Sequence, residues 1–348
     1  MLLIMSLLWA YSIYAQIRSI TRISSVQEVT NQLRLQSVSA KASAFEDFPE
    51  SKRIAVNIHN LLCKNDDVSG LNITKQEKEM QIDWNTLCSE YFVISATRQL
   101  LQGHDVNVVQ IGAHIGFEMN DPIAQGLSRL LDEVEAAAVK DAARNETRQR
   151  FHWTFVEPSP PNFKRLTENL LNHSTLCDMK GINVGVVSDD FTDLSEMLFY
   201  SVRDTIDPES GYDSLSGKTF PFWITQVSSF SKTPLHNCEF VFNRLGLQLK
   251  DYIVETKVTT KSYSNLMQEA LARSGGKKEE PLLVLIDTEG LDCDIIKGIH
   301  TDSPYLPRYL VFEHKQCEDR EGAYEHLKKL GYKLYTTAYE NAVAVKIQ

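Results

Sequence analysis

Two carboxylates one residue apart follow a short apolar run late in the chain. They are Asp287 and Glu289, in the sequence IDTEG at 286–290. A carboxylate at the end of a strand can act as the general base that removes a proton from a hydroxyl group. Asp287 is the first candidate for this base, with Glu289 at the same catalytic edge. His114, whose type suits proton transfer near neutral pH, is the second candidate. In the alternative interpretation Asp287 caps the next helix and Glu289 is only solvated.

The same two acids could instead hold a divalent cation. Oxygen ligands suit Mg²⁺ or Ca²⁺, and a bound cation would lower the pKa of a hydroxyl substrate. The sequence does not show whether the ligands converge, so this alternative stays open but is not favoured, and no metal ligand is assigned. The six cysteines include no CxxC and no Cys/His cluster at zinc spacing, so structural zinc is not expected.

A glycine turn follows the first apolar run, at 106–111. The turn reads GAHIG, and Gly112 and Gly116 have no side chains, so the backbone can approach a ligand closely at the end of the strand. This pattern is typical of a nucleotide-binding turn, although a plain strand-to-helix turn has the same spacing.

A third acid, Glu157, directly follows the apolar run at 152–156. An acid at the tip of the second strand can accept hydrogen bonds from both ribose hydroxyls of a bound nucleoside. The interval from Gly116 to Glu157 is about twice the ~20 residues usual in dinucleotide folds, and there is no GxGxxG. Helical spacing at 123–138 accounts for the excess. S-adenosylmethionine therefore fits better than NAD as the cofactor.

These residues need a parallel sheet to bring them together. Short apolar runs at 106–111, 152–156, 182–187, 282–286 and 309–312, separated by helical patterns, predict parallel strands buried on both faces. The tail predicts two strands, at 332–339 and 342–346, around a polar turn at 340–341. The long insertion at about 189–281 exceeds a simple connection and is expected to cover a binding site.

The ordered motifs IGAHIG, FVEP, INVGVVS, IDTEG with LDCDIIKG, YLVFEH and LKKLGYKLY resemble those of the FkbM-type methyltransferases, from residue 106 to the C-terminus. The resemblance implies an α/β, Rossmann-like class I methyltransferase fold: a mostly parallel sheet with a C-terminal antiparallel hairpin. It implies methyl transfer from S-adenosylmethionine to a hydroxyl of a sugar, glycan or related metabolite. By motif position it assigns Asp287 and Glu289 to the catalytic edge, and to the cofactor Gln110, Gly112, Ala113, Gly116 and Glu157. The family commonly has Asp where Gln110 stands.

The N-terminus predicts entry into the secretory pathway, in the lumen of the endoplasmic reticulum or Golgi or as a secreted protein. Residues 1–15 are apolar and uncharged, as in a signal peptide, with a short signal anchor as the alternative. The sequence predicts a polar N-terminal extension or stem at 16–90 and the methyltransferase domain at 91–348. Glycosylation sequons begin at Asn72, Asn145 and Asn172. Six cysteines allow 15 pairings; Cys63 with Cys88 is the preferred guess, because both flank the start of the domain.

The net charge is −10, and no Lys/Arg run is longer than Lys277-Lys278. Nucleic acid is therefore not an expected partner. The expected partner is a small-molecule or glycan substrate. No membrane insertion is expected beyond the N-terminal segment. Two rival functions remain: a NAD-type oxidoreductase, and a secreted binding protein that keeps the fold without catalysis.

Overall fold

The computed structural model of this protein describes residues 96, 99–100, 104–116, 149–172, 177–191, 195–272, 280–336 and 341–347. All of them belong to the second of two units, residues 74–348. Several predictions lie outside the described residues: the signal segment and stem, the Cys63–Cys88 pair, the helix at 123–138, and the sequons at Asn72 and Asn145.

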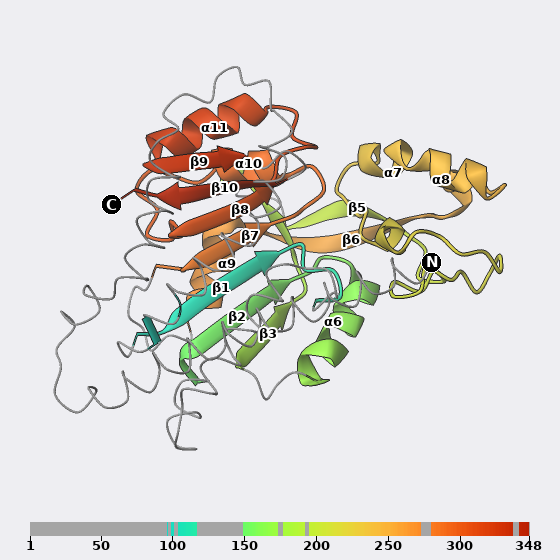
Figure 1. Cartoon of the computed structure of the whole chain (residues 1–348), viewed down its shortest axis with the longest axis horizontal. Helices are drawn as coiled ribbons and strands as arrows, with labels where there is room; N and C mark the ends of the chain where they lie inside the picture. Colours follow the sequence, from blue (N-terminus) through green and yellow to red (C-terminus); the bar gives the residue numbers. More distant parts are fainter. Residues whose placement is uncertain are drawn as a thin grey trace, which may run out of the picture. The chain divides into compact units, whose positions relative to one another are not determined.

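The central element is a seven-stranded sheet in the order β3-β2-β1-β7-β8-β10-β9 (Figure 1). Its strands are β1 (Val106–Ile111), β2 (Phe151–Val156), β3 (Asp178–Ile182), β7 (Leu283–Ile286), β8 (Tyr309–Glu313), β9 (Tyr332–Thr336) and β10 (Asn341–Lys346). Strands β3, β2, β1, β7 and β8 pair in parallel, and β10 is antiparallel to both of its neighbours. The fold is therefore mixed α/β with a mostly parallel sheet, as predicted.

One predicted strand is wrong. The apolar run at 182–187 is divided between two sheets: Ile182 ends β3, whereas β4 (Gly185–Val187) pairs with β6 (Ile253–Ser262) in a separate three-stranded sheet. The cause is Asn183, whose side-chain amide donates hydrogen bonds to the carbonyls of Glu157 at 2.7 Å and Pro158 at 3.2 Å. Asn183 directly follows the end of β3 at Ile182, so its hydrogen bonds hold the chain where it leaves the first sheet.

The predicted antiparallel hairpin is confirmed, with one difference in its bounds. Strand β10 lies between β8 and β9. Asn341, which the sequence placed in the turn, is the first residue of β10 and pairs with Glu313. The side chain of Asn341 therefore lies at the same edge of the sheet as the end of β8.

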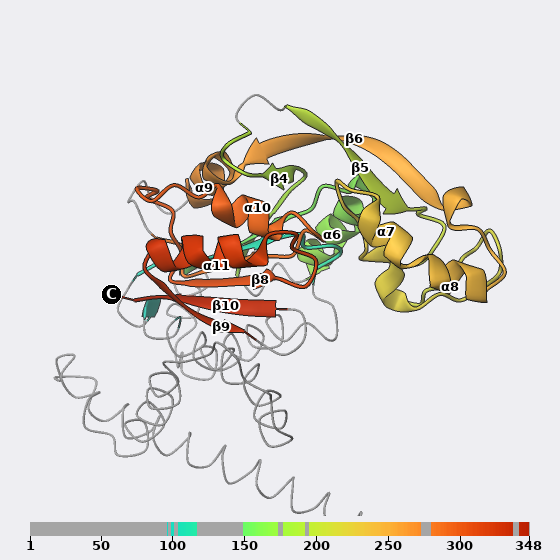
Figure 2. The same cartoon turned by 90° about the horizontal axis from the view of Figure 1, so that it is seen from above.

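Helices cover both faces of the sheet. Figure 2 shows α9 (Tyr263–Leu271), α10 (Asp292–Lys297) and α11 (Arg320–Lys329) on one face. Val109 and Ile111 belong to the hydrophobic core that these helices form with the sheet. The other face carries Val106 and Val108, because side chains alternate along a strand. There α6 (Pro160–Asn172) packs Leu166 and Leu170, one turn apart, against the aromatic residues of β2.

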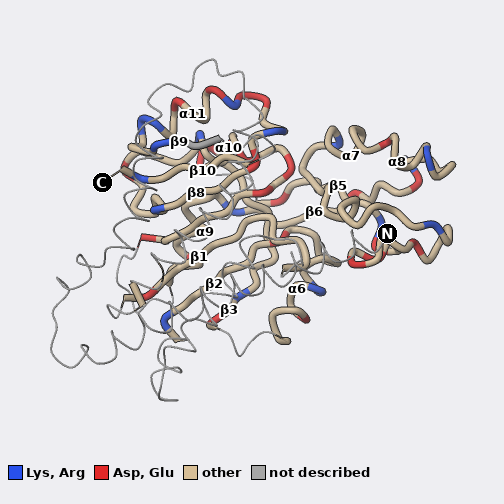
Figure 3. Tube along the Cα trace, in the orientation of Figure 1, with Lys and Arg blue, Asp and Glu red and all other residues tan. Residues whose placement is uncertain are grey.

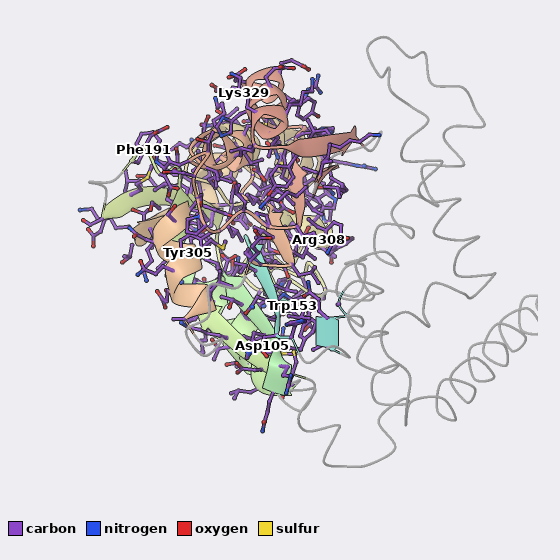
Figure 4. All side chains as sticks on the ribbon, turned by 90° about the vertical axis from the view of Figure 1, so that its left-hand side faces the viewer. Asp105, Trp153, Phe191, Tyr305, Arg308 and Lys329 are labelled. Carbon is purple, nitrogen blue, oxygen red and sulfur yellow. A yellow bond between two sulfur atoms is a disulfide. The ribbon has the colours of Figure 1, made fainter. Side chains whose placement is uncertain are left out.

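Side chains fill the space around the large sheet, and charged residues lie on its outer helix α11. In the side-chain view, Lys329 of α11 lies at one extremity and Asp105, which precedes β1, at the other, with densely packed side chains between them (Figure 4). Charges of both signs lie side by side on α11, as on an exposed helix (Figure 3). None of the helices in the described ranges combines the length and apolar character needed to cross a bilayer.

The segment predicted as an insertion has a hydrophobic core of its own. It contains β5 (Glu196–Val202), which pairs with β6, and the short helices η2 (Phe222–Thr225), α7 (Thr233–Asn237), α8 (Glu239–Arg244) and η3 (Leu249–Asp251). Phe220, Phe242 and Tyr252 stack at the centre of this core, with ring centroids 5.0–5.6 Å apart. Buried Asp213 accepts a hydrogen bond from the Tyr252 hydroxyl at 2.9 Å. Although desolvation opposes it, hydrogen bonds to the carboxylate lower the pKa of Asp213 to about 2.

A disulfide joins Cys293 of α10 to Cys317, in the segment that follows β8. Cys177 and Cys238 are buried thiols. The sequence left the pairing of Cys293 open.

Candidate functional site

A cavity of about 340 Å³ lies at the carboxyl ends of β1, β2 and β7. The strand order reverses here: from β1 the chain continues to β2 and β3 on one side and returns to pair β7 on the other. Such a switch point is where open α/β sheets bind ligands. All eight residues that the sequence assigned to cofactor or catalysis line this cavity: Gln110, Gly112, Ala113, His114, Gly116, Glu157, Asp287 and Glu289.

Gly112, directly after β1, lies in close contact with Asp287, directly after β7. Its φ is +80°, and a Cβ atom there would lie 1.6 Å from the carbonyl oxygen of Asp287. The amides of Gly112 and Ala113 donate hydrogen bonds to the carbonyl of Val156 at 2.9 and 3.0 Å, and the amide of Asp287 donates to that of Ile111 at 2.9 Å. The glycine turn is therefore fastened to the ends of both β2 and β7.

Gly116 is explained by helix packing. Its φ is +63°, and an added Cβ would lie 2.7 Å from Cδ1 of Leu166 on α6. The Asn169 side chain, also on α6, donates a hydrogen bond to the carbonyl of Ile115 at 2.8 Å. The sequence analysis explained Gly116 by close approach of the backbone to a ligand. Its close contact with α6 is enough to explain why this position holds a glycine.

Glu157 is held at the tip of β2 by the backbone. One carboxylate oxygen accepts from the amide of His114 at 2.9 Å and the other from the amide of Ser159 at 2.8 Å. The residue is only 4% exposed, and desolvation raises its pKa to about 7, against the opposing influence of His114 and these hydrogen bonds. A carboxylate accepts more than two hydrogen bonds, so Glu157 can still receive ligand hydroxyls.

His114 contributes through its backbone. Its φ is +48°, an uncommon value for a residue with a side chain, and this turn directs its amide at Glu157. The buried residue also lines the cavity. The sequence named His114 the second candidate base. In the structure its backbone amide holds the carboxylate of Glu157 in place.

Three carboxylates meet at the ends of β7 and β8. One oxygen each of Asp287, Glu289 and Glu313 lies within 4.8 Å of the other two. Asp287 is exposed and Glu313 is buried. The sequence singled out the first two acids and missed Glu313, although it ends the run YLVFE just as Asp287 follows LLVLI. Such a trio has the oxygen chemistry of a divalent cation site.

Asp292 shapes the loop that carries the acids. It is 1% exposed and accepts from the hydroxyl of Thr288 at 2.8 Å and from the amides of Thr288 and Gly290, each at 3.3 Å. Burial raises its pKa to about 6. Sequence reasoning gave Asp292 no role. The alternative in which Asp287 caps the next helix is wrong, because the N-cap of α10 is Leu291, with no side-chain cap.

Glu289 is held by two hydrogen bonds, one to its backbone and one to its side chain. It has a φ of +54°, its carbonyl accepts from the hydroxyl of Ser229 at 2.8 Å, and its carboxylate accepts from the side chain of Gln316. Gln316 precedes Cys317, whose disulfide with Cys293 ties the segment after β8 to α10, the helix that follows the loop of Asp287 and Glu289.

The far wall of the cavity comes from the 189–281 segment, as the length of that segment predicted. Its lining residues are three aromatic and two polar side chains: Phe199, Phe222, Phe230, Gln226 and Ser228. The sequence drew attention to the stretch Ser228 to Ser231 but gave no role to any of the five.

The charge of the cavity is one-sided. Among the described residues that line it are the carboxyl groups of Glu157, Asp287 and Glu289, but no Lys or Arg. Phosphates and other multiply charged anions require cationic or amide-rich partners. The wall therefore disfavours a polyanionic ligand and favours a neutral or cationic one.

No family model, no curated protein and no solved structure matches this chain.

Proposed function

We propose that this protein is an S-adenosylmethionine-dependent O-methyltransferase on a Rossmann-like class I methyltransferase fold, acting on a hydroxyl of a sugar, glycan or related metabolite. The observation that carries the proposal is the cavity at the switch point, which gathers the glycine turn, Glu157 and the acids after β7. The hairpin strand β10, antiparallel within a parallel sheet, agrees with this fold.

Glu157 would hold the ribose of S-adenosylmethionine, and the glycine turn would let the backbone approach the same molecule closely. Gln110 lines the cavity next to Leu285 and offers an amide oxygen to the ammonium group of the methionine moiety. Carboxylates around the cavity stabilise a sulfonium cation, whereas the pyrophosphate of NAD would find no lysine or arginine among the described lining residues. The charge of the wall therefore supports S-adenosylmethionine over a dinucleotide.

Bound S-adenosylmethionine would supply a methyl group to the acceptor oxygen by in-line displacement, and its sulfonium would leave as a neutral thioether. The main contribution of the protein is to align the two reactants. Asp287, exposed in the cavity, takes the hydroxyl proton, and the loop held by Asp292 positions it. A divalent cation on the acid trio is the alternative way to lower the pKa of the hydroxyl.

Calorimetry of the purified chain with S-adenosylmethionine tests this proposal directly. Binding in the micromolar range, with displacement by S-adenosylhomocysteine, is the expected result. Failure to bind either molecule would remove the enzymatic proposal and leave the catalytically inactive binding protein.

Glu157→Ala should weaken binding of S-adenosylmethionine by about 1.5–3 kcal/mol, the range for hydrogen bonds to a charged group. Calorimetry measures this, with Glu196→Ala, an exposed acid on β5, as the control. Equal affinities for the two variants would show that Glu157 does not hold the ribose.

The same carboxyl group predicts a pH dependence. Its pKa is about 7 in the folded protein and 4.5 ordinarily, so the folded state retains a proton that the unfolded state has lost between these values. The free energy of unfolding of the ligand-free protein should therefore decrease as pH rises from about 4.5 to 7. Denaturant titrations at several pH values measure the slope, which should be smaller in Glu157→Gln.

We also propose that the protein enters the secretory pathway. The Cys293–Cys317 disulfide and the exposed position of Asn172, at the end of α6, support this location. Material from a glycosylating host should shift in mobility after endoglycosidase treatment, and mutation of all three sequon asparagines to Gln should remove the shift. An unchanged mobility of the unmutated protein would contradict the proposal.

A further inference from the structure

We infer that the 189–281 segment forms the acceptor subsite, that this subsite takes a neutral, hydroxyl-rich acceptor, and that Phe222 and Ser228 bind it. The inference rests on the proposed function, because it divides the same cavity into a cofactor half and an acceptor half.

The division follows from which element supplies each wall. The glycine turn and Glu157 lie at the ends of β1 and β2, whereas Phe222, Gln226 and Ser228 come from the 189–281 segment. Asp287 and Glu289 lie at the end of β7 and line the same cavity. A ligand held by the 189–281 segment would therefore share the cavity with the candidate base.

Ser228 is the polar group of this half that calls for a ligand. Its Oγ atom is buried, and within the part of the chain that the structure describes it has no hydrogen-bond partner. A buried hydroxyl without a partner is destabilising, so such groups normally find one. Because Ser228 lines the cavity, rotation of its side chain about the Cα–Cβ bond would present the hydroxyl to a bound acceptor, whose own hydroxyl can supply that partner.

Phe222 is the apolar surface of the subsite. It is 48% exposed although it lines the cavity, so part of the residue is in contact with solvent. Two other phenylalanines of the lining are fixed: Phe230 packs edge-on against Phe199 with centroids 5.2 Å apart, and Gly185 leaves room for the Phe230 ring. An aromatic face beside hydroxyl-binding groups suits the C–H face of a sugar ring.

The charge of the cavity selects among such molecules. Asp287 and Glu289 would repel a phosphate, sulfate or carboxylate on the acceptor, and no Lys or Arg among the described lining residues offsets them. Neutral glycosides are therefore favoured over their anionic counterparts.

The test measures transfer of a labelled methyl group from S-adenosylmethionine to a panel of neutral methyl hexosides and to the matching methyl hexuronides, which differ by one carboxylate. The expected result is a kcat/KM at least about tenfold higher for the neutral member of a pair. Equal or greater transfer to the hexuronides would overturn the inference, and so would no transfer to any hexoside by a protein that binds S-adenosylmethionine. A preference for the hexuronides would leave the proposed function in place, transfer to no hexoside would remove simple sugars from it, and absence of cofactor binding would remove both the inference and the proposed function.

Two variants test the residues. Ser228→Ala and Phe222→Ala should each raise the acceptor KM by about three- to tenfold, the range for one hydrogen bond or one aromatic contact, with the Kd for S-adenosylmethionine unchanged. Phe240→Ala, an exposed phenylalanine on α8 outside the lining of the cavity, is the matched control and should leave KM unchanged. An unchanged acceptor KM in both test variants, or an equal loss of cofactor affinity, would overturn the assignment.

Discussion

Asp287→Asn should lower the rate of methyl transfer by roughly 10²–10⁴-fold, the usual contribution of a general base. The substitution preserves the shape of the side chain and removes the proton acceptor. Because the backbone of Asp287, which pairs with Ile111, is unchanged, the site should stay assembled and cofactor binding should survive. Single-turnover methyl transfer measures the loss, and calorimetry measures the retained affinity.

Asp294→Asn is the matched control, because Asp294 is an exposed acid of α10 that does not line the cavity. It should transfer methyl groups at the unmutated rate. If the acids hold a cation instead, chelator would abolish turnover of the unmutated protein and added Mg²⁺ would restore it. Full turnover by Asp287→Asn, together with indifference to chelator, would remove both roles.

Gly112→Ala should destabilise the protein by about 2–5 kcal/mol. Holding alanine at positive φ costs about 1–2 kcal/mol, and forcing a methyl group into a filled space adds about 1–3 kcal/mol. The added Cβ would lie 1.6 Å from the carbonyl oxygen of Asp287, so β1 and β7 would have to separate where the site is built. Denaturant unfolding measures the loss in free energy.

Gly217→Ala separates the two contributions. Gly217 also has a positive φ, +69°, but an added Cβ would meet nothing within 4 Å. It should lose only the conformational part, about 1–2 kcal/mol. Equal losses for Gly112→Ala and Gly217→Ala would mean that the contact between the glycine turn and Asp287 is not tight.

The gathering of the eight site residues could be predicted because one physical rule covers them. Parallel strands end at a common edge, so Gly112, Glu157 and Asp287, each directly after an apolar run, had to lie near one another. The same rule, applied to the run at 309–312, would have found Glu313. Glu313 was therefore predictable, because the same signal, an acid directly after an apolar run, is present there in the sequence.

The remaining residues could not be found in this way. Ser228 and Phe222 lie in a segment with little periodic pattern, and its fold over the cavity depends on tertiary contacts that the sequence does not display. Asp292 acts through hydrogen bonds to Thr288 and Gly290, which need the loop geometry to be known. The division at Asn183 depended on two side-chain hydrogen bonds, whereas apolar spacing predicted one continuous strand.

Part of the 189–281 segment, from β5 to η3, packs around a hydrophobic core of its own, and Ser229 of this part donates a hydrogen bond to the carbonyl of Glu289. Phe220, Phe242 and Tyr252 pack among themselves, whereas the glycine turn and Glu157 depend on the packing of the large sheet. Substitutions in distant, separately packed regions are nearly additive in their energies. Mutations that accumulate around Phe220, Phe242 and Tyr252 should therefore change the far wall of the cavity with little effect on the glycine turn and Glu157. Under the proposed function, acceptor choice would then change without loss of the pocket for the methyl donor.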